Sequence, residues 1–300
     1  MMTKVGIDLR GGDHAPTAIL EGLRLAKPLL KDQTELHLFG LAEDFLDLEE
    51  GPWKTHACTQ FISMEEHPVK ALQAKPDSTM VRGLYALKTQ AIDSWASAGH
   101  SGALMVASMQ ALGLMEGISR PVVVSLFPKL NGDSIAVLDV GINVDAKAEQ
   151  FLEFAELGTA YAKALMQKPD PKMALLNTGT EPSKGSVVYQ KAHRLLQESA
   201  YSFEGNLEAR ELYDNDIDVL LCDGFTGNMV LKQTEAFYSI AQKRGLQDSF
   251  IAKMNYENYG ASPILGVKGK VLLAHGASGP EAIKSMILSA ESFALANFAE

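Results

Sequence analysis

The stretch that decides the fold runs Leu220-Leu221-Cys222-Asp223-Gly224-Phe225-Thr226-Gly227-Asn228-Met229-Val230-Leu231-Lys232. It passes from an apolar strand through a turn containing glycine into a helix. Gly224 and Gly227 free the backbone for a sharp turn whose N–H groups can face a ligand. Asp223, Thr226 and Asn228 follow the carboxyl end of a buried parallel strand, where open α/β sheets bind their ligands. The stretch therefore predicts an α/β protein with a site at this edge of the sheet.

The same alternation extends along the rest of the chain. Short β-rich runs predict strands over residues 4–9, 35–39, 121–127, 134–140, 172–177, 218–222 and 271–274. Amphipathic stretches predict helices over residues 16–30, 80–97, 149–167, 185–199, 227–243 and 280–297. This order is typical of βαβ units. We therefore expect a three-layer α/β/α sandwich with a mainly parallel sheet, formed by a single domain over residues 1–300.

Two segments are candidate protrusions from that domain. Residues 121–138 read as two strands joined through Asn131-Gly132, a strong hairpin signal. Hairpins of this kind often build dimer interfaces. The second segment, at about 245–262, has a lower apolar density.

Composition excludes several classes of protein. The chain has 300 residues and a net charge of −10. Because binding to a nucleic-acid backbone needs a basic surface, this charge makes nucleic acid an unexpected partner. Cys58 and Cys222 show neither metal-ligand spacing nor a disulfide framework, as is typical of a reducing cytoplasm. The segment at residues 4–8 is too short and carries charge too early for a signal peptide, so we expect none, and no apolar run approaches the ~18 residues needed to cross a bilayer. We expect a soluble or at most peripheral cytoplasmic protein.

Loops rich in glycine follow the predicted strands or open the predicted helices, at residues 11–16, 97–102, 141–145, 177–181, 224–228 and 274–279. Free N–H groups at helix N-termini bind anions, so loops that converge on one sheet edge would form a phosphate or oxyanion pocket. None of them has Walker A spacing, a G-x-G-x-x-G fingerprint or a G-x-S-x-G nucleophile elbow. A standard nucleotide site and an α/β-type serine hydrolase are therefore disfavoured.

Taken as a set, the loops resemble the PlsX family, the bacterial phosphate acyltransferases of phospholipid synthesis. The string IDLRGGDHAP at residues 7–16 resembles that family's DAMGGDHAP signature. Further similar strings follow in the same order, at residues 97–105, 117–121, 143–145, 184–185, 205–208, 222–228, 259–261 and 274–276. The resemblance covers essentially the whole chain. Departures lie in the loops and leave room for an altered substrate preference or a lost activity; they are Arg10, His100, Thr180, Ala209, Ala277 and Gly279.

The resemblance implies both fold and reaction. Family members are similar in fold to isocitrate and isopropylmalate dehydrogenases, and they transfer a fatty acyl group from acyl carrier protein to inorganic phosphate. It also implies a homodimer and no cofactor or metal. A membrane glycerol-3-phosphate acyltransferase is a further implied partner. The segment that touches the bilayer in the family corresponds to residues 233–258, which are shorter here, so we expect weak or no direct membrane binding.

Site residues carry over from the matching motifs. Phosphate binding falls to Arg10, Gly11, Gly12, Ser101, Gly102 and Asn143. Catalytic roles fall to Asp13, Lys184, Asp223, Asn228 and His275, with Lys184 as the cation and His275 or Asn228 bonding the thioester oxygen. Because acyl carrier protein is acidic, its docking needs a local basic surface, for which the candidates are Lys232, Lys243, Arg244 and Lys253.

Structural interpretations of the same residues stay open. Asp13 could cap the helix that starts at Pro16, Asp223 could form a turn, and His275 could be a satisfied core histidine. Lys184 could be a solvated residue. A cation at a helix start is, however, disfavoured by the helix dipole unless an anion lies nearby. Two other functions also remain open: a metal- and nicotinamide-dependent dehydrogenase of the same fold, and a non-catalytic scaffold for acyl carrier protein or a membrane acyltransferase.

Overall fold

The computed structural model describes residues 2–46 and 48–298, which divide into two compact units. The first unit comprises the described residues of 2–115 and 256–296. The second comprises residues 116–255 together with 297 and 298. That the chain acts as a single domain stays a prediction, and each unit is described by itself.

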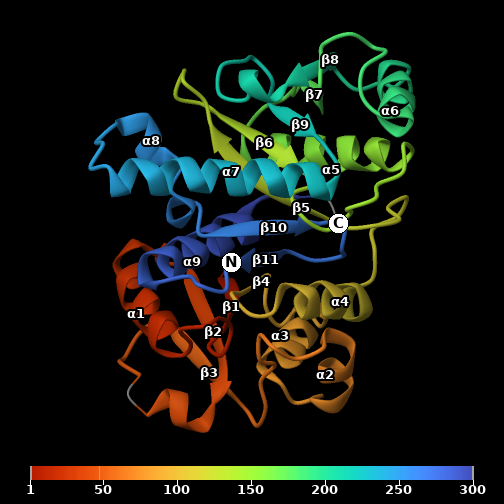
Figure 1. The fold of residues 1–300 in the computed structure, drawn as a ribbon. Coiled ribbons are helices and arrows are strands. Elements are labelled where there is room, and N and C mark those ends of the chain that lie inside the picture. The colour runs from red at the N-terminus through yellow and green to blue at the C-terminus, as the bar shows by residue number, and fades with distance from the viewer. Residues whose placement is uncertain (1, 47, 299–300) are drawn as a thin grey trace. The chain divides into compact units, whose positions relative to one another are not determined.

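Six strands form the sheet of the first unit, in the order β3-β2-β1-β4-β11-β10 (Figure 1). Neighbouring strands are parallel except β10 and β11. The strands are β1 (Thr3–Asp8), β2 (Thr34–Leu41), β3 (Trp53–Cys58), β4 (Ser94–Ser97), β10 (Ala261–Leu265) and β11 (Val271–Ala274). Because β1, β4 and β11 are parallel neighbours, their carboxyl ends lie at one edge of the sheet.

Helices cover both faces of this sheet. On one side α1 (Thr17–Ala26) packs against α9 (Pro280–Leu295), so closely that a Cβ built on Gly22 would lie 2.4 Å from the Ile283 side chain. On the other side lie α2 (Pro68–Ala74), α3 (Thr79–Lys88) and α4 (Ser101–Leu112), as Figure 1 shows. The fully buried Trp95 ring meets Phe39 edge-on, with ring centres 5.2 Å apart.

The second unit is built on five strands in the order β5-β6-β9-β7-β8. They are β5 (Val122–Pro128), β6 (Ser134–Leu138), β7 (Met173–Asn177), β8 (Phe203–Glu208) and β9 (Val219–Leu221). All pairs are parallel except β5 and β6, which form an antiparallel hairpin with Val124 opposite Leu138. The hairpin predicted from Asn131-Gly132 is therefore confirmed, and Gly132 has the positive φ of 92° that its turn requires.

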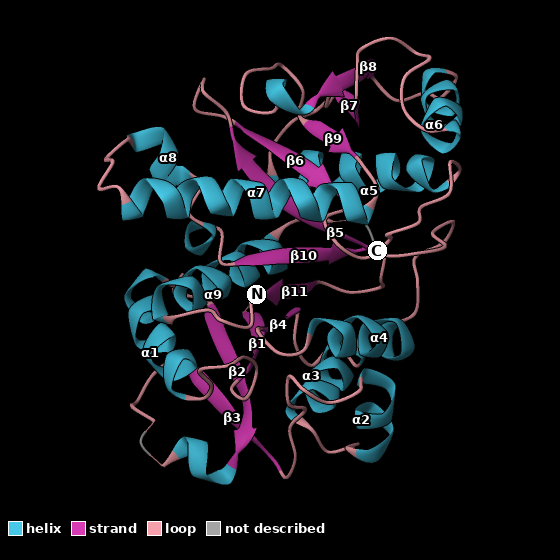
Figure 2. Cartoon of the chain, viewed as in Figure 1, coloured by secondary structure: helices cyan, strands magenta, loops and turns pink. Residues whose placement is uncertain are grey.

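The helices of the second unit are α5 (Gln150–Leu165), α6 (Val187–Gln197), α7 (Gly224–Lys243) and α8 (Ser249–Lys253). In Figure 2, α7 lies in front of β6, and α5 packs against β6 and β9. Two glycines permit this packing. A Cβ on Gly158 of α5 would lie 2.6 Å from Val219, and one on Gly227 of α7 would lie 2.0 Å from the Asp139 carbonyl oxygen.

The mainly parallel α/β fold expected from the sequence is confirmed. One predicted helix is wrong in part, because the helix expected over residues 80–97 ends at Lys88 and its last four residues form β4. Short 3-10 helices complete the structure at Lys27–Leu29, Ala42–Phe45, Ala209–Glu211 and Tyr256–Asn258. That residues 121–138 and 245–262 protrude stays a prediction.

Candidate functional site

Loops that follow β1, β4 and β11 converge in the first unit. A Cβ on Gly11 would lie 2.7 Å from the Gly99 amide nitrogen and 2.8 Å from the Ser97 hydroxyl, so only glycine fits there. Gly12 has a φ of +103°, which favours glycine. The Asp13 N–H donates to the Gly276 carbonyl at 2.8 Å. Three of the six glycine-rich loops are thus brought together, as the parallel order of their strands predicts.

A buried carboxylate at the end of β1 holds these loops through hydrogen bonds. Asp8, at the end of β1, accepts hydrogen bonds from the Ser97 hydroxyl at 2.7 Å and the Arg10 N–H at 3.1 Å. Ser97 in turn accepts from the Gly99 N–H at 3.0 Å. Burial raises the pKa of Asp8, and the hydrogen bond from Ser97 opposes that rise. Asp8 and Ser97 are absent from the predicted site; their signal is a polar residue that ends an otherwise apolar strand.

Arg10 is engaged by carboxylates. Its guanidinium contacts Asp44 at 2.6 and 2.8 Å and Glu43 at 3.0 Å, and it lies 5.5 Å from the centre of the Phe61 ring. Asp44 is almost fully buried. The charge expected to hold phosphate is thus already matched by two carboxylates, and a phosphate-binding role for Arg10 stays a prediction.

Polar side chains around the same loops differ in availability. The Asp13 carboxylate and the Ser101 hydroxyl are exposed and form no hydrogen bond with any residue that the structure describes. His100 caps α4, because its Nδ1 accepts from the Ala103 N–H at 3.3 Å, and Gly102 lies in the first turn beside its ring. The Nδ1 of His275 accepts from the Ala277 N–H at 3.1 Å. A neutral His275 ring therefore carries its proton on Nε2, as a hydrogen-bond donor.

A second buried carboxylate organises the loops of the other unit. Asp139 accepts hydrogen bonds from the N–H groups of Val123, Gly141, Ile142 and Asn143, at 3.1, 3.3, 3.1 and 2.5 Å. Burial raises its pKa, against the lowering effect of these donors. Asp139 is absent from the predicted site residues, although it follows a buried strand and lies two residues before Gly141, while Asp223, which was predicted, lies directly before Gly224.

Asn143 is part of this scaffold. Its side-chain nitrogen donates to the Pro121 carbonyl at 2.8 Å and to Asp139 at 3.0 Å, and its own carbonyl accepts from the Gly224 N–H at 2.8 Å. The residue is buried. The structure thus joins the loop after β6 to the start of α7, while contact of Asn143 with phosphate stays a prediction.

Asp223 caps α7, because its Oδ1 accepts from the Thr226 N–H at 2.7 Å. The helix therefore begins at Gly224, three residues before the predicted start at residue 227. One turn into α7, Asn228 is exposed, and its side chain faces Gly141, where a built Cβ would lie 3.8 Å from the Asn228 amide oxygen. Its amide makes no hydrogen bond with a described residue.

Lys184 lies in the loop between β7 and α6, with its side chain about half exposed. Its methylene groups fold over Gly179, where a built Cβ would lie 2.9 Å from them. Among the residues that the structure describes, the ammonium group has only a loose ion pair, with Glu181 at 3.8 Å. Gly185 follows with a φ of +80°, and a Cβ there would lie 2.5 Å from the Asn177 amide oxygen. A cation is therefore held near the carboxyl end of β7 without a close anion among the described residues.

The predicted docking residues lie along α7 and α8. Lys243 ends α7, Arg244 follows it and Lys253 ends α8, whereas Lys232 is paired with Glu235 at 2.8 Å. The same helix exposes large apolar side chains, namely Phe225, Met229, Phe237 and Ile240. None of the helices in residues 2–46 and 48–298 is long and apolar enough to cross a membrane.

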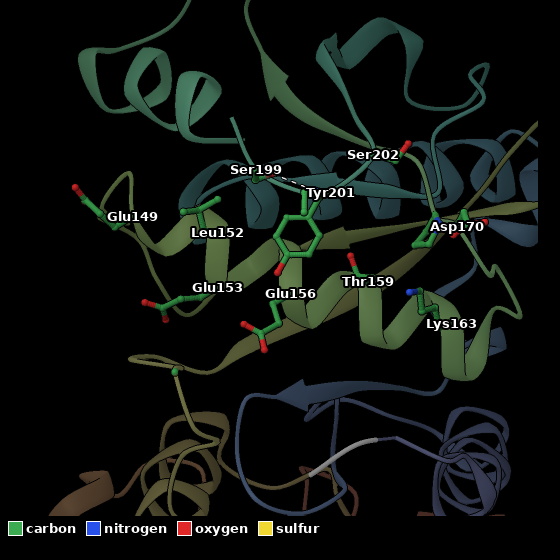
Figure 3. Close-up of a pocket in the computed structure, with 13 residues that line it drawn as sticks. Glu149, Leu152, Glu153, Glu156, Thr159, Lys163, Asp170, Ser199, Tyr201 and Ser202 are labelled. Carbon is green, nitrogen blue, oxygen red and sulfur yellow. Dashed lines mark hydrogen bonds between the residues drawn. The ribbon is translucent and has the colours of Figure 1, made fainter. Parts of the chain in front are cut away.

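A separate hollow of about 780 Å³ lies on the outer face of α5. Figure 3 shows Tyr201 pointing toward the helix, above Glu156 and beside Thr159. Burial and the nearby Glu156 charge raise the pKa of Tyr201. No predicted site residue lines this hollow, whose lining is Gly117, Glu149, Leu152, Glu153, Glu156, Thr159, Lys163, Asp170, Pro171 and residues 199–202.

Groups of three or more His, Cys, Asp or Glu side chains that could hold a metal ion are absent from the described part of the chain. Cys58 and Cys222 are free and buried, and burial raises the pKa of Cys58 to about 11.

Comparison with known proteins places the chain in a family. The family model described as fatty acid synthesis protein matches residues 3–300. A phosphate acyltransferase of Staphylococcus haemolyticus is 39% identical, over 97% of this chain and 94% of its own length.

Solved structures share the fold. A branched-chain phosphotransacylase from Enterococcus faecalis has a TM-score of 0.67 at 17% identity, covering 97% of this chain and 99% of its own. A 4-hydroxythreonine-4-phosphate dehydrogenase from Burkholderia phymatum has a TM-score of 0.54 at 14% identity, covering 99% of both chains. The expected likeness to dehydrogenases is thus confirmed at the level of fold. From the family match and the 39% identity with a named acyltransferase, we conclude that the chain belongs to the PlsX family of phosphate acyltransferases and is an enzyme.

Proposed function

We propose that this enzyme transfers a fatty acyl group from acyl carrier protein to inorganic phosphate and releases acyl phosphate. The observation that carries the proposal is the 39% identity, over 97% of the chain, with a relative named phosphate acyltransferase. The family description, fatty acid synthesis protein, supports a fatty acyl donor held on acyl carrier protein. The product would serve phosphatidic acid and phospholipid synthesis.

The chemistry requires positioning more than covalent help. A phosphate oxygen attacks the thioester carbonyl carbon, the C–O bond forms, and the carbonyl electron pair moves to oxygen. The intermediate then collapses, the C–S bond breaks, and the thiolate leaves with that bond's electron pair. A thiol with a pKa near ~8.5 leaves readily, so orientation and donors aimed at the developing oxyanion should supply most of the rate, with orientation worth ~7 kcal/mol or more.

The role proposed for each residue follows from the contacts that its side chain makes with the described residues. In the first unit, backbone N–H groups of Gly11, Gly12 and Gly102 and the Ser101 hydroxyl would bind phosphate. Asp13 would orient them, since its exposed carboxylate lies against Gly276 in the same loop cluster. His275 keeps its predicted role as a donor to the oxyanion, and a neutral ring whose Nδ1 accepts a hydrogen bond carries its proton on Nε2.

In the second unit, Lys184 would supply the cation for phosphate. Its only ion pair with a described residue is the loose contact with Glu181 at 3.8 Å. Asp223 would orient the reacting groups from the start of α7, and Asn228 is the alternative donor to the thioester oxygen. Arg10 and Asn143 keep their predicted phosphate roles, although both already bond to protein groups.

Partners and location complete the proposal. The protein would act in the cytoplasm as a homodimer, without cofactor, metal or nucleic acid, and pass its product to a membrane glycerol-3-phosphate acyltransferase. Exposed Phe237 and Ile240 on α7 support a protein surface that covers this helix. Direct membrane binding would be weak or absent.

The test measures product with alternative acyl donors. Incubation with acyl-carrier-protein thioester and phosphate, followed by hydroxylamine, should give the hydroxamate, and omission of phosphate should abolish it. The same acyl group on coenzyme A should react more slowly. Equal or faster reaction from coenzyme A would refute the carrier protein as donor, and no hydroxamate from either thioester would refute acyl transfer to phosphate.

A further inference from the structure

Tyr189, on α6, forms a two-point hydrogen-bonded contact with Asp223. Its hydroxyl donates to Asp223 Oδ2 at 2.7 Å, and its oxygen accepts from the Asp223 backbone N–H at 3.0 Å. The other carboxylate oxygen of Asp223 accepts from the Thr226 N–H at 2.7 Å. The carboxylate is thus held from α7 through one oxygen and from α6 through the other.

Packing holds the Tyr189 ring in place. The ring meets Phe151 of α5 edge-on, with centres 5.3 Å apart, and Phe151 is fully buried. Burial is also the main reason that the pKa of Tyr189 lies well above its ordinary value. The hydroxyl therefore keeps its proton near neutral pH and remains a donor to Asp223.

The same residue is joined to the Lys184 loop. The Ser186 hydroxyl caps α6 by accepting a hydrogen bond from the Tyr189 backbone N–H at 3.4 Å. A Cβ built on Gly185 would lie 3.0 Å from the Tyr189 Cβ, which leaves no room between the loop and the side chain. Lys184 precedes this glycine directly. One side chain thus connects the loop that carries the proposed phosphate cation with the carboxylate at the start of α7.

We propose that Tyr189 is a positioning residue that fixes the Asp223 carboxylate relative to the Lys184 loop during acyl transfer, an inference that rests on the function proposed above. Without the hydroxyl, Oδ2 has no partner among the described residues, and the carboxylate can turn about its Cβ–Cγ bond while Oδ1 still caps α7. A displacement of about 1 Å in a reacting geometry can lower a rate by about 10²-fold.

The Tyr189→Phe variant tests this role, because it removes the hydroxyl and keeps the ring against Phe151. We expect kcat to fall about tenfold with little change in the phosphate KM, as for loss of one hydrogen bond to a charged group. The matched control is Tyr213→Phe. It removes another half-buried hydroxyl, bonded to Thr234 at 2.6 Å, and Thr234 lies about 16 Å along α7 from Asp223 at 1.5 Å per residue.

Comparison of the two variants separates positioning from general stability. If Tyr189 positions Asp223, kcat falls in Tyr189→Phe but not in Tyr213→Phe. This difference should remain even if thermal unfolding shows that both variants lower the melting temperature equally. The effect should also shrink when Tyr189→Phe is added to Asp223→Asn, which keeps an amide oxygen to cap α7. If the wild type is active and kcat is unchanged in Tyr189→Phe, the positioning role is contradicted while the proposed function stands. The same conclusion follows if kcat falls equally in both tyrosine variants. An inactive wild type instead contradicts the proposed function, and the positioning role with it.

Discussion

At the scale of single residues, burial separates groups that build the loops from groups that can meet a substrate. Asp8 and Asp139 are buried carboxylates that gather loop N–H and hydroxyl groups at the ends of β1 and β6. Asp13 lies exposed in the loop after β1 and Asn228 lies exposed in the second turn of α7, and the side chain of neither forms a hydrogen bond with a described residue. A carboxylate that accepts several N–H groups holds a loop in one conformation. The exposed side chains are therefore presented on a fixed backbone.

Lys184 gives the first prediction at this scale. Lys184→Met should raise the phosphate KM and lower kcat/KM by about 10²-fold, as for loss of one charge-assisted contact worth about 2–3 kcal/mol. The matched control is Lys191→Met on α6, which removes an exposed lysine paired with Glu149. Steady-state kinetics with varied phosphate check it. A phosphate KM that is the same in Lys184→Met and wild type would make Lys184 a solvated loop residue.

At the scale of elements, α7 combines the proposed site at its start with a basic end. The sequence predicted its start at residue 227, three residues late, although an aspartate between an apolar strand and glycines is a cap signal. Lys243 and Arg244 lie at the opposite end of this 20-residue helix. Attraction of an acidic carrier to such a surface is screened over about 8 Å at physiological salt.

Reversal of charge at this end of α7 should weaken carrier docking. Lys243→Glu and Arg244→Glu should each raise the KM for the acyl-carrier-protein thioester, and salt should raise it in the wild type. Acyl-pantetheine, which lacks the carrier, is the control substrate and should react at an unchanged rate. Equal losses with both substrates would show that these residues act on the fold or the chemistry rather than on docking.

The edge of the sheet formed by β2 and β3 contains a histidine pair. His37 Nδ1 and His56 Nε2 are 2.9 Å apart, and His37 Nε2 lies 2.9 Å from Glu35. Burial is the main reason that the pKa of both histidines is lowered. The positive charge of Lys54 lowers both pKa values further, and that of Arg82 lowers the pKa of His56. The negative charge of Glu35 acts in the opposite direction. The folded state therefore binds fewer protons than the unfolded chain, whose histidines titrate near about 6.5.

The sign of the pH effect follows from that difference. Stability rises with pH wherever the unfolded state binds more protons, so this pair should destabilise the fold as pH drops below about 6.5. In His56→Gln, which removes one of the two titrating rings, the melting temperature should fall less between pH 7.5 and pH 5.5 than in the wild type. Thermal unfolding at both pH values measures this. If the melting temperature falls equally in the variant and the wild type, groups other than this histidine pair determine the pH dependence of stability.

At the scale of the whole molecule, local signals predicted the elements that combine an apolar run with clear turn chemistry. The hairpin at Asn131-Gly132 and the strand before Asp223 are examples. The strands β3 and β8 were missed, because Lys54, Thr55 and Glu204 interrupt their apolar pattern at exposed positions. β4 was missed because it has only four residues and only five residues separate it from the end of α3.

Site residues were predictable to the extent that glycine marks a loop. Gly11 and Gly12 could be identified from sequence, because close approach and a positive φ demand glycine there. The partners of Arg10 and the contact between Tyr189 and Asp223 could not. They depend on side chains 33 or 34 positions apart in the chain, which only the packed fold brings together.

The central claim is acyl transfer to inorganic phosphate, and phosphorus NMR of the reaction tests it most directly. With acyl-carrier-protein thioester and phosphate, the phosphate signal should decrease as an acyl phosphate signal appears, with one thiol released per acyl phosphate formed. Thiol release without an acyl phosphate signal would instead identify a thioesterase. That result, or no change in either signal while the thioester stays intact, would contradict the claim.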